Sequence, residues 1–156
     1  MNKIQYLQDG NDMPVLDMIT QIAHQGMAGD HEAQMLAKYI AQGMNVLESI
    51  DIPANKRYLW VTQNEQNNPI SFTILKDLTS APPLLEFRIN RSEPGAFRAI
   101  FFEYDYQGEH YLVFTQALIK TGDPNPPELQ TKIQRSLEQY REVVQPPDHY
   151  LEGSGS

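Results

Sequence analysis

Hydrophobic and polar positions follow two different periods in the first fifty residues. Residues 3–7 alternate between apolar and polar side chains, which predicts a short β-strand. Residues 11–14 then combine capping side chains with a proline, as at a helix start, and apolar residues recur downstream at helical spacing. Gly26 and Gly29 are expected to break this helix, and Asp30 to cap a second one. The two helices predict an antiparallel helical hairpin.

The period changes to two in the middle of the chain. Alternation of apolar and polar residues predicts a series of strands joined by tight connections. The pair Gln107-Gly108 suits a two-residue hairpin turn. The expected strands cover residues 58–62, 70–75, 84–89, 97–106 and 110–117.

A helical period returns at the C-terminal end. Asn125 is expected to cap this helix, Pro126 to occupy its first position, and Glu128 to complete a capping box. Helices and strands are segregated along the chain, so the fold class is α+β. The expected architecture is an N-terminal strand and a helical hairpin packed on a mainly antiparallel sheet, with a C-terminal helix. Residues 1–145 are expected to form one domain and 146–156 a flexible tail, in which 153–156 resemble a linker or a cloning scar.

Composition narrows the function classes. The 156 residues suit one domain, and the net charge of −8, from 12 basic and 20 acidic residues, disfavours generic nucleic-acid binding. The absence of cysteine excludes disulfides, thiolate catalysis and thiolate metal sites. No secretory signal and no apolar run of membrane-spanning length is visible, so the expected location is the cytoplasm.

Common catalytic and cofactor motifs are absent from the sequence. It contains no glycine-rich nucleotide loop and no Gly-x-Ser-x-Gly elbow. The four histidines do not have metal-ligand spacing, so neither a metal nor a cofactor is expected. These histidines are His24, His31, His110 and His149.

Three cations stand out because they lie on predicted strands in a chain that has few basic residues. Arg88 and Arg98 lie within apolar strands, and Lys120 lies at a strand end. An unpaired charge in such a strand is costly, so each arginine needs a carboxylate partner, such as Glu86 or Glu103, or a solvated groove. Ion pairing at the sheet edge would explain the arginines without a functional role, and a lysine at a strand end is often simply solvated.

The order of motifs between residues 75 and 142 resembles the HigB-like, phage-derived branch of the RelE/ParE superfamily of bacterial toxins. Members read as a Glu-Leu-Arg strand, a Tyr-Arg strand followed by aromatics, a strand ending in a Phe-x-Lys-Lys-Thr-like motif, and a proline-containing turn into a helix. The counterparts here are Leu75-Lys76-Asp77-Leu78 before the first motif, Glu86-Phe87-Arg88, Phe97-Arg98 with Phe101-Phe102, Ile119-Lys120-Thr121, and Pro126-Pro127.

This resemblance implies the toxin of a type II toxin–antitoxin system, a ribosome-dependent mRNA endoribonuclease held inactive by a helix-turn-helix antitoxin. The catalytic candidates are Arg88 and Arg98, which would hold the phosphate, and Lys120, which would contact the phosphate or stabilise the leaving group. No histidine falls at an obvious general-base position. The resemblance implies outer RNA contacts for Lys76 and Arg91, and base stacking for Tyr104 or Tyr106. Plain surface charge also explains the two cations, and strand packing also explains the tyrosines.

Departures from the family pattern keep other functions open. One lysine, Lys120, stands where members often carry two, residues 54–74 are additional strand-forming sequence, and residues 75–142 hold 8 basic and 10 acidic residues.

The main alternative is a non-catalytic, prophage-encoded protein-interaction domain of the same fold. An unrelated α+β structural domain is the third reading. A groove shared by the three cations would favour the nuclease, and exposed strand edges leave a homodimer open.

Overall fold

The computed structural model describes residues 1–122 and 126–145 and confirms the α+β class. The expected tail, residues 146–156, and the expected cap at Asn125 lie outside the described residues. The elements, in chain order, are β1 (Lys3–Tyr6), α1 (Pro14–Met27), α2 (His31–Ser49), β2 (Tyr58–Gln63), β3 (Pro69–Asp77), β4 (Leu85–Ile89), β5 (Ala96–Tyr106), β6 (Glu109–Lys120) and α3 (Pro127–Val144).

The strands form one six-stranded sheet in the order β1-β6-β5-β4-β3-β2. All neighbours are antiparallel except β1 and β6, which run parallel. The β5–β6 hairpin turns at Gln107 and Gly108, whose φ angles of 50° and 81° are both positive, as in a type I′ turn. The two-residue hairpin predicted from the sequence is therefore confirmed.

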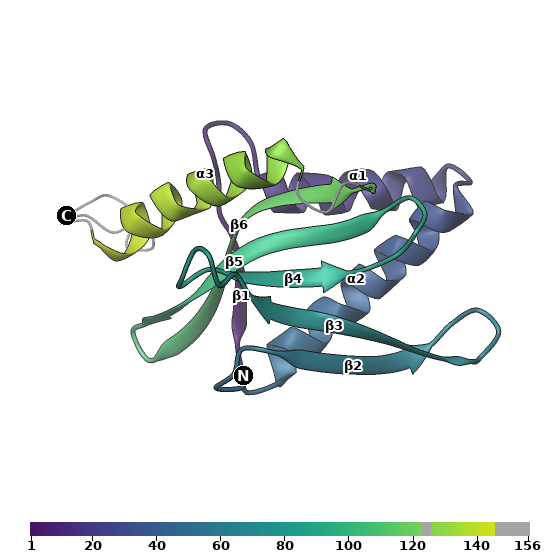
Figure 1. Ribbon diagram of the computed structural model, residues 1–156, viewed down its shortest axis with the longest axis horizontal. Coiled ribbons are helices and arrows are strands. Elements are labelled where there is room, and N and C mark those ends of the chain that lie inside the picture. Colours follow the sequence, from purple (N-terminus) through teal and green to yellow (C-terminus); the bar gives the residue numbers. More distant parts are fainter. Residues whose placement is uncertain (123–125, 146–156) are drawn as a thin grey trace.

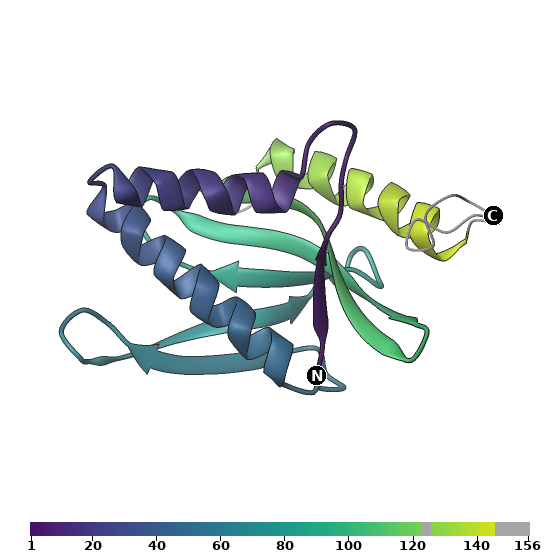
Figure 2. The same ribbon diagram turned by 180° about the vertical axis from the view of Figure 1, so that it is seen from behind.

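The helices cover the two faces of the sheet unequally. α1 and α2 lie together on one face, with α2 crossing the strands diagonally (Figure 2). On the other face α3 packs on β5 and β6, whereas no described helix covers β2, β3 and β4 (Figure 1). We call the α3-side surface of these three strands the open face. The side chains that strand register places on it are Leu59, Val61, Ser71, Thr73, Lys76, Glu86 and Arg88.

The connection between the first two helices differs from the prediction at Gly26. This glycine lies within α1 rather than ending it. A Cβ atom at Gly26 would lie 2.7 Å from the Cα atom of Gln34, so the glycine lets α1 and α2 approach closely. The helix ends at Met27, and Asp30 caps α2 as predicted, because its Oδ1 accepts a hydrogen bond of 3.1 Å from the Ala33 amide.

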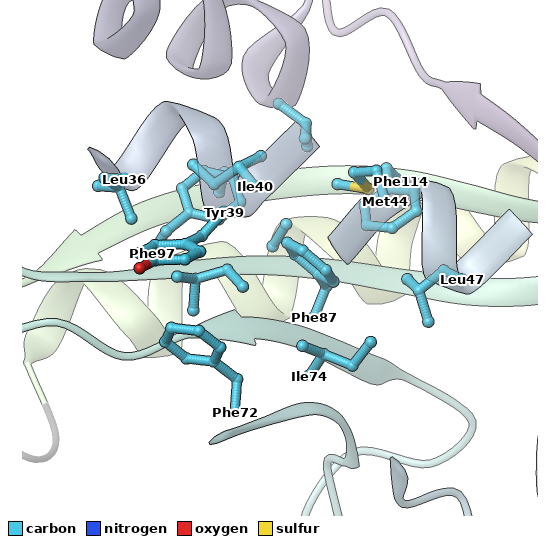
Figure 3. Packing of buried hydrophobic residues seen from close by; sticks show 14 of the residues in the cluster. Leu36, Tyr39, Ile40, Met44, Leu47, Phe72, Ile74, Phe87, Phe97 and Phe114 are labelled. Atoms are coloured by element: carbon cyan, nitrogen blue, oxygen red, sulfur yellow. The ribbon is translucent and has the colours of Figure 1, made fainter. Parts of the chain in front are cut away.

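The larger hydrophobic core lies between the α1/α2 layer and the sheet (Figure 3). Tyr39 from α2 packs on Phe72 of β3, and Phe87 of β4 meets Phe114 of β6 edge-on. A second cluster beneath α3 includes Ile100 and Leu118. The sheet is thus apolar on both faces at β5 and β6, where helices cover both sides.

Polar contacts fix α3 and the N-terminal loop to the sheet. Arg135 of α3 donates to both carboxylate oxygens of Asp9, from Nε at 3.2 Å and from Nη2 to Oδ1 at 3.0 Å. Gln116 of β6 donates at 2.9 Å both to Asp9 and to Gln139 of α3. These bonds join three segments that are distant in sequence.

The tight contact between α2 and β4 predicts that Gly43→Ala destabilises the protein. A Cβ atom at Gly43 would lie 2.9 Å from Cζ of Phe87, a buried ring. Overpacking of this kind costs about 1–3 kcal/mol and outweighs the roughly 1 kcal/mol that alanine gains over glycine in a helix. Urea denaturation should show the loss. Asn45→Ala, at an exposed position of the same helix, is the control and should leave stability unchanged or slightly higher.

The Asp9–Arg135 contact predicts an acid-sensitive contribution to stability. The hydrogen bond from Arg135 holds the pKa of Asp9 below its ordinary value of 3.8. A lowered pKa in the folded state means that the stabilisation is complete above pH 3.8 and is lost as the pH falls further. Asp9→Asn should lower the free energy of unfolding by roughly 1–2 kcal/mol at neutral pH.

Denaturation curves over a pH series provide the measurement. The deficit of the Asp9→Asn variant should shrink once the pH falls below 3.8. Asp51→Asn, at an exposed position, should track the wild type throughout. A deficit that does not change with pH would contradict this assignment.

Candidate functional site

Strand register brings Arg88 and Arg98 together. The two residues are direct partners between β4 and β5, so their side chains leave the sheet on the same face. Arg98 is also the partner of Leu118, whose side chain packs in the cluster beneath α3, and this identifies the face as the α3 side. Glu86, two residues before Arg88 on β4, points the same way.

One carboxylate serves both arginines. Oε1 of Glu86 lies 3.5 Å from Nε of Arg88 and 3.4 Å from Nη1 of Arg98. The Glu86 side chain is 3% exposed and that of Arg98 10%. The group therefore carries one net positive charge in a largely dehydrated setting. Burial, with Arg98 nearby, lowers the pKa of Arg88 from its ordinary value, and Glu86 opposes that shift.

Hydrogen-bonding capacity in this group is left unused. Among the described residues, Oε2 of Glu86 and the Nε atoms of Arg88 and Arg98 are buried without a hydrogen-bond partner. Buried guanidinium N–H groups that make no hydrogen bond are costly. An anion bound between the arginines would satisfy them, because phosphate and carboxylate oxygens match the guanidinium geometry.

Two lysines extend the arginine pair on the same face. Lys76 of β3 is the direct partner of Glu86. Lys120 is paired with Ala96, two residues before Arg98 on β5, so it lies diagonally from Arg98 on the α3 side. We call Lys76, Arg88, Arg98 and Lys120 the cationic row. It spans four adjacent strands, β3 to β6.

Arg57 joins this group without having been predicted from the sequence. It lies just before β2, where it pairs with Asp77 at 3.9 Å, and its charge acts on Arg88. Its position depends on the return of β2 along β3, a long-range pairing that no local pattern encodes. The only available signal was a basic residue next to the additional strand segment.

Arg91 lies away from the cationic row. It follows β4, donates to Glu32 of α2 at 3.0 Å, and its guanidinium carbon lies 5.4 Å from the centre of the Tyr39 ring. These contacts are on the side of the sheet covered by α1 and α2. Arg91 therefore fastens the β4–β5 loop to α2, and the outer RNA contact predicted for it does not join the arginine pair.

The two tyrosines also lie apart from the arginine pair. Tyr104 and Tyr106 stack with ring centres 6.0 Å apart, near the β5–β6 turn. Tyr104 follows Arg98 by six residues on the same strand, which places it about 20 Å away. A base stacked on these rings would belong to a nucleotide other than one whose phosphate lies between the arginines.

Glu103, the other carboxylate that the sequence suggested as a partner for the arginines, belongs to a separate group of polar side chains. Glu103 pairs with Lys56 at 2.6 Å and with Nε2 of His110 at 2.9 Å, and Nδ1 of His110 lies 2.5 Å from Asp105. Glu86 is thus the partner of both arginines, and Glu103 holds the loop before β2 against β5.

The shared carboxylate predicts a large effect of Glu86→Gln on stability. The substitution removes the counter-charge and leaves two buried guanidinium groups facing each other. Losing one partner of a buried ion pair costs about 3–5 kcal/mol. Chemical denaturation should show this loss. Glu109→Gln, which breaks the exposed pair with Lys3, is the control and should cost below about 1 kcal/mol.

Comparison with known proteins identifies no relative of this chain. No protein family, curated protein or solved structure matches the chain. Within the described ranges, no three histidine or acidic side chains are grouped so that they could hold a metal ion. No described helix is long and apolar enough to cross a membrane. The cationic row is therefore the candidate site on the strength of its own residues.

Proposed function

We propose that the chain is a cytoplasmic mRNA endoribonuclease, the toxin of a type II toxin–antitoxin pair of the HigB-like RelE/ParE kind. The observation that supports this proposal most is the pairing of Arg88 with Arg98 on one face, with Lys120 diagonally beyond them. Had register sent these cations to different faces, they could not act on one phosphate. The order of motifs along the sequence agrees with the same proposal.

The arginine pair is suited to hold a phosphodiester. In the proposed reaction a ribose 2′-hydroxyl attacks the adjacent phosphorus, and the bond to the 5′-oxygen of the next nucleotide breaks. Negative charge accumulates on the phosphorane oxygens, where preorganised donors act most strongly. The guanidinium groups of Arg88 and Arg98, whose Nε atoms make no hydrogen bond to a described residue, would supply such donors. Glu86 holds both guanidinium groups in place and reduces their mutual repulsion.

Lys76 and Lys120 would act on either side of the proposed contact between the arginine pair and the phosphodiester. Lys120 lies on the β6 side of Arg98, where it would stabilise the leaving oxygen or hold its phosphate. Lys76 lies on the β3 side, over the open face, where it would hold a neighbouring phosphate. The row provides local positive charge on a chain of net charge −8. The proposed partners are the ribosome with its mRNA and a helix-turn-helix antitoxin that inhibits the toxin.

A non-catalytic protein-interaction domain of the same fold is the second candidate. Two observations favour it: the net charge of −8, and the exposure of Leu59 and Val61 on the open face, at 61% and 60%. Exposed apolar residues next to cations suit a protein partner. In that case the arginine pair would bind a carboxylate of the partner.

Inducible expression in a bacterial host tests the nuclease proposal. The wild type should arrest growth and leave cleaved mRNA. Arg98→Lys keeps a charge beside Glu86 but loses the planar fork, so we expect cleavage to fall about 10²–10³-fold. Arg98→Ala should abolish the arrest. Lys38→Ala, at an exposed position of α2 on the other side of the sheet, is the matched control and should be as toxic as the wild type.

Folding of each variant is checked by circular dichroism and thermal melting. Normal growth with folded wild-type protein and intact mRNA would reject the nuclease and favour the interaction domain. Toxicity that survives in folded Arg98→Lys and Arg98→Ala would show that the arginine pair is not the site.

A further inference from the structure

β2 is an edge strand that carries neither charge nor proline. Its six residues, Tyr58–Gln63, pair with β3 on one side, and no described strand lies on the other. Natural edge strands usually carry lysine, proline or a bulge that prevents pairing with another chain. β2 carries a register shift only at its start, between Tyr58 and Leu59. The rest of the strand presents a regular, unprotected edge.

The side chains of β2 divide sharply between the two faces. Trp60 stacks on Phe72 at 5.7 Å between ring centres and packs against the α2-side core. Leu59 and Val61 therefore point to the open face, where they are 61% and 60% exposed. Both are among the most exposed large apolar side chains of the described residues. They lie on β2, one of the two edge strands of the sheet, whose outer edge is paired with no described strand.

We propose that β2 pairs antiparallel with β2 of a second copy, about a two-fold axis at Trp60. In this register Leu59 lies directly opposite Val61 of the second copy, and Val61 opposite its Leu59. The four exposed apolar side chains then form two cross-strand pairs on the open face. A shift of one residue would instead place Leu59 opposite a residue from the other face. A shift of two residues would pair Leu59 with Leu59 or Val61 with Val61 and leave the other two apolar side chains opposite Arg57 or Gln63, so only the register centred at Trp60 pairs all four.

Charge complementarity supports a second copy as the occupant. Arg57 precedes β2, is half exposed and lies 3.9 Å from Asp77, whereas Glu65 follows β2 in the β2–β3 loop and lies 3.4 Å from Nε2 of His31. Antiparallel pairing at Trp60 places Arg57 opposite Gln63 of the second copy and diagonally near its Glu65, with the reciprocal contact at the other end. Two chains of net charge −8 repel each other, and a strand without charged residues adds no like-charge contact of its own to that repulsion.

The dimer would join two sheets into one continuous sheet with both open faces on the same side. The α1 and α2 helices of both copies would lie on the opposite side. Five strand spacings, about 24 Å across the sheet, would separate β4 of one copy from β4 of the other, and β5 would lie one spacing further out in each copy. This assembly does not depend on the proposed nuclease, since it rests on β2 alone.

Sedimentation and light scattering over a concentration series test the dimer. The wild type should approach twice the chain mass of 17.9 kDa as its concentration rises. Leu59→Lys and Val61→Lys should each remain monomeric, because they place charges in the paired edge. Met27→Lys introduces a lysine at a position that is 83% exposed and that lies at the end of α1 rather than on β2, and it should dimerise like the wild type.

Disulfide trapping tests the register, and the cysteine-free chain makes introduced thiols unique. Oxidising a mixture of Leu59→Cys and Val61→Cys proteins should give mainly the mixed dimer. Direct partners have Cα atoms about 4.5–5.5 Å apart, within disulfide reach, whereas identical positions lie on the diagonal at about 7–8 Å. A monomer at every concentration, a dimer insensitive to both lysine variants, or no preference for the mixed dimer would each overturn the proposal.

Discussion

The alignment of β4, β5 and β6 is the constraint on which the rest of the structure depends. Phe87, Phe97 and Phe101 are fully buried on the α2 side of these strands. Because side chains alternate along a strand, a slip of one residue would move these rings to the α3 side and bring the charged side chains between them into the α2-side core. Burial of the aromatics therefore also determines that Arg88 and Arg98 emerge together on the opposite face.

Two positive charges that lie close together and largely buried on the α3 side of the sheet require a counter-charge. Glu86 supplies it, but a single carboxylate cannot satisfy both guanidinium groups, and buried donors remain without partners among the described residues. A purely structural network would be expected to satisfy its own groups. Unsatisfied cations at the margin of a helix-covered region are more typical of a site that binds an anion.

The unequal covering by helices links the two proposals. α3 packs over β5 and β6, and no described helix covers β4, β3 and β2 on that side (Figure 1). The cationic row crosses this side of the sheet from β6 to β3, and Leu59 and Val61 lie on the same side of β2. The additional hairpin thus widens the open face and supplies its free edge at the same time.

The sequence by itself determined the elements and their class, since the helical and strand periods, the Asp30 cap and the Gln107-Gly108 turn are local patterns. It also singled out Arg88 and Arg98, because charges in apolar strands need a partner. Gly26 is an exception, because it lies within α1 and does not end it. Its role is to let α2 approach α1 closely, and the sequence of α1 alone does not show which helix will pack there. Tertiary structure alone decided which cations share a face, that Glu86 serves both arginines, that Arg91 joins α2 instead, and that β2 forms the edge. These are consequences of strand register and of contacts between distant segments, which hydrophobic periodicity along the chain does not encode.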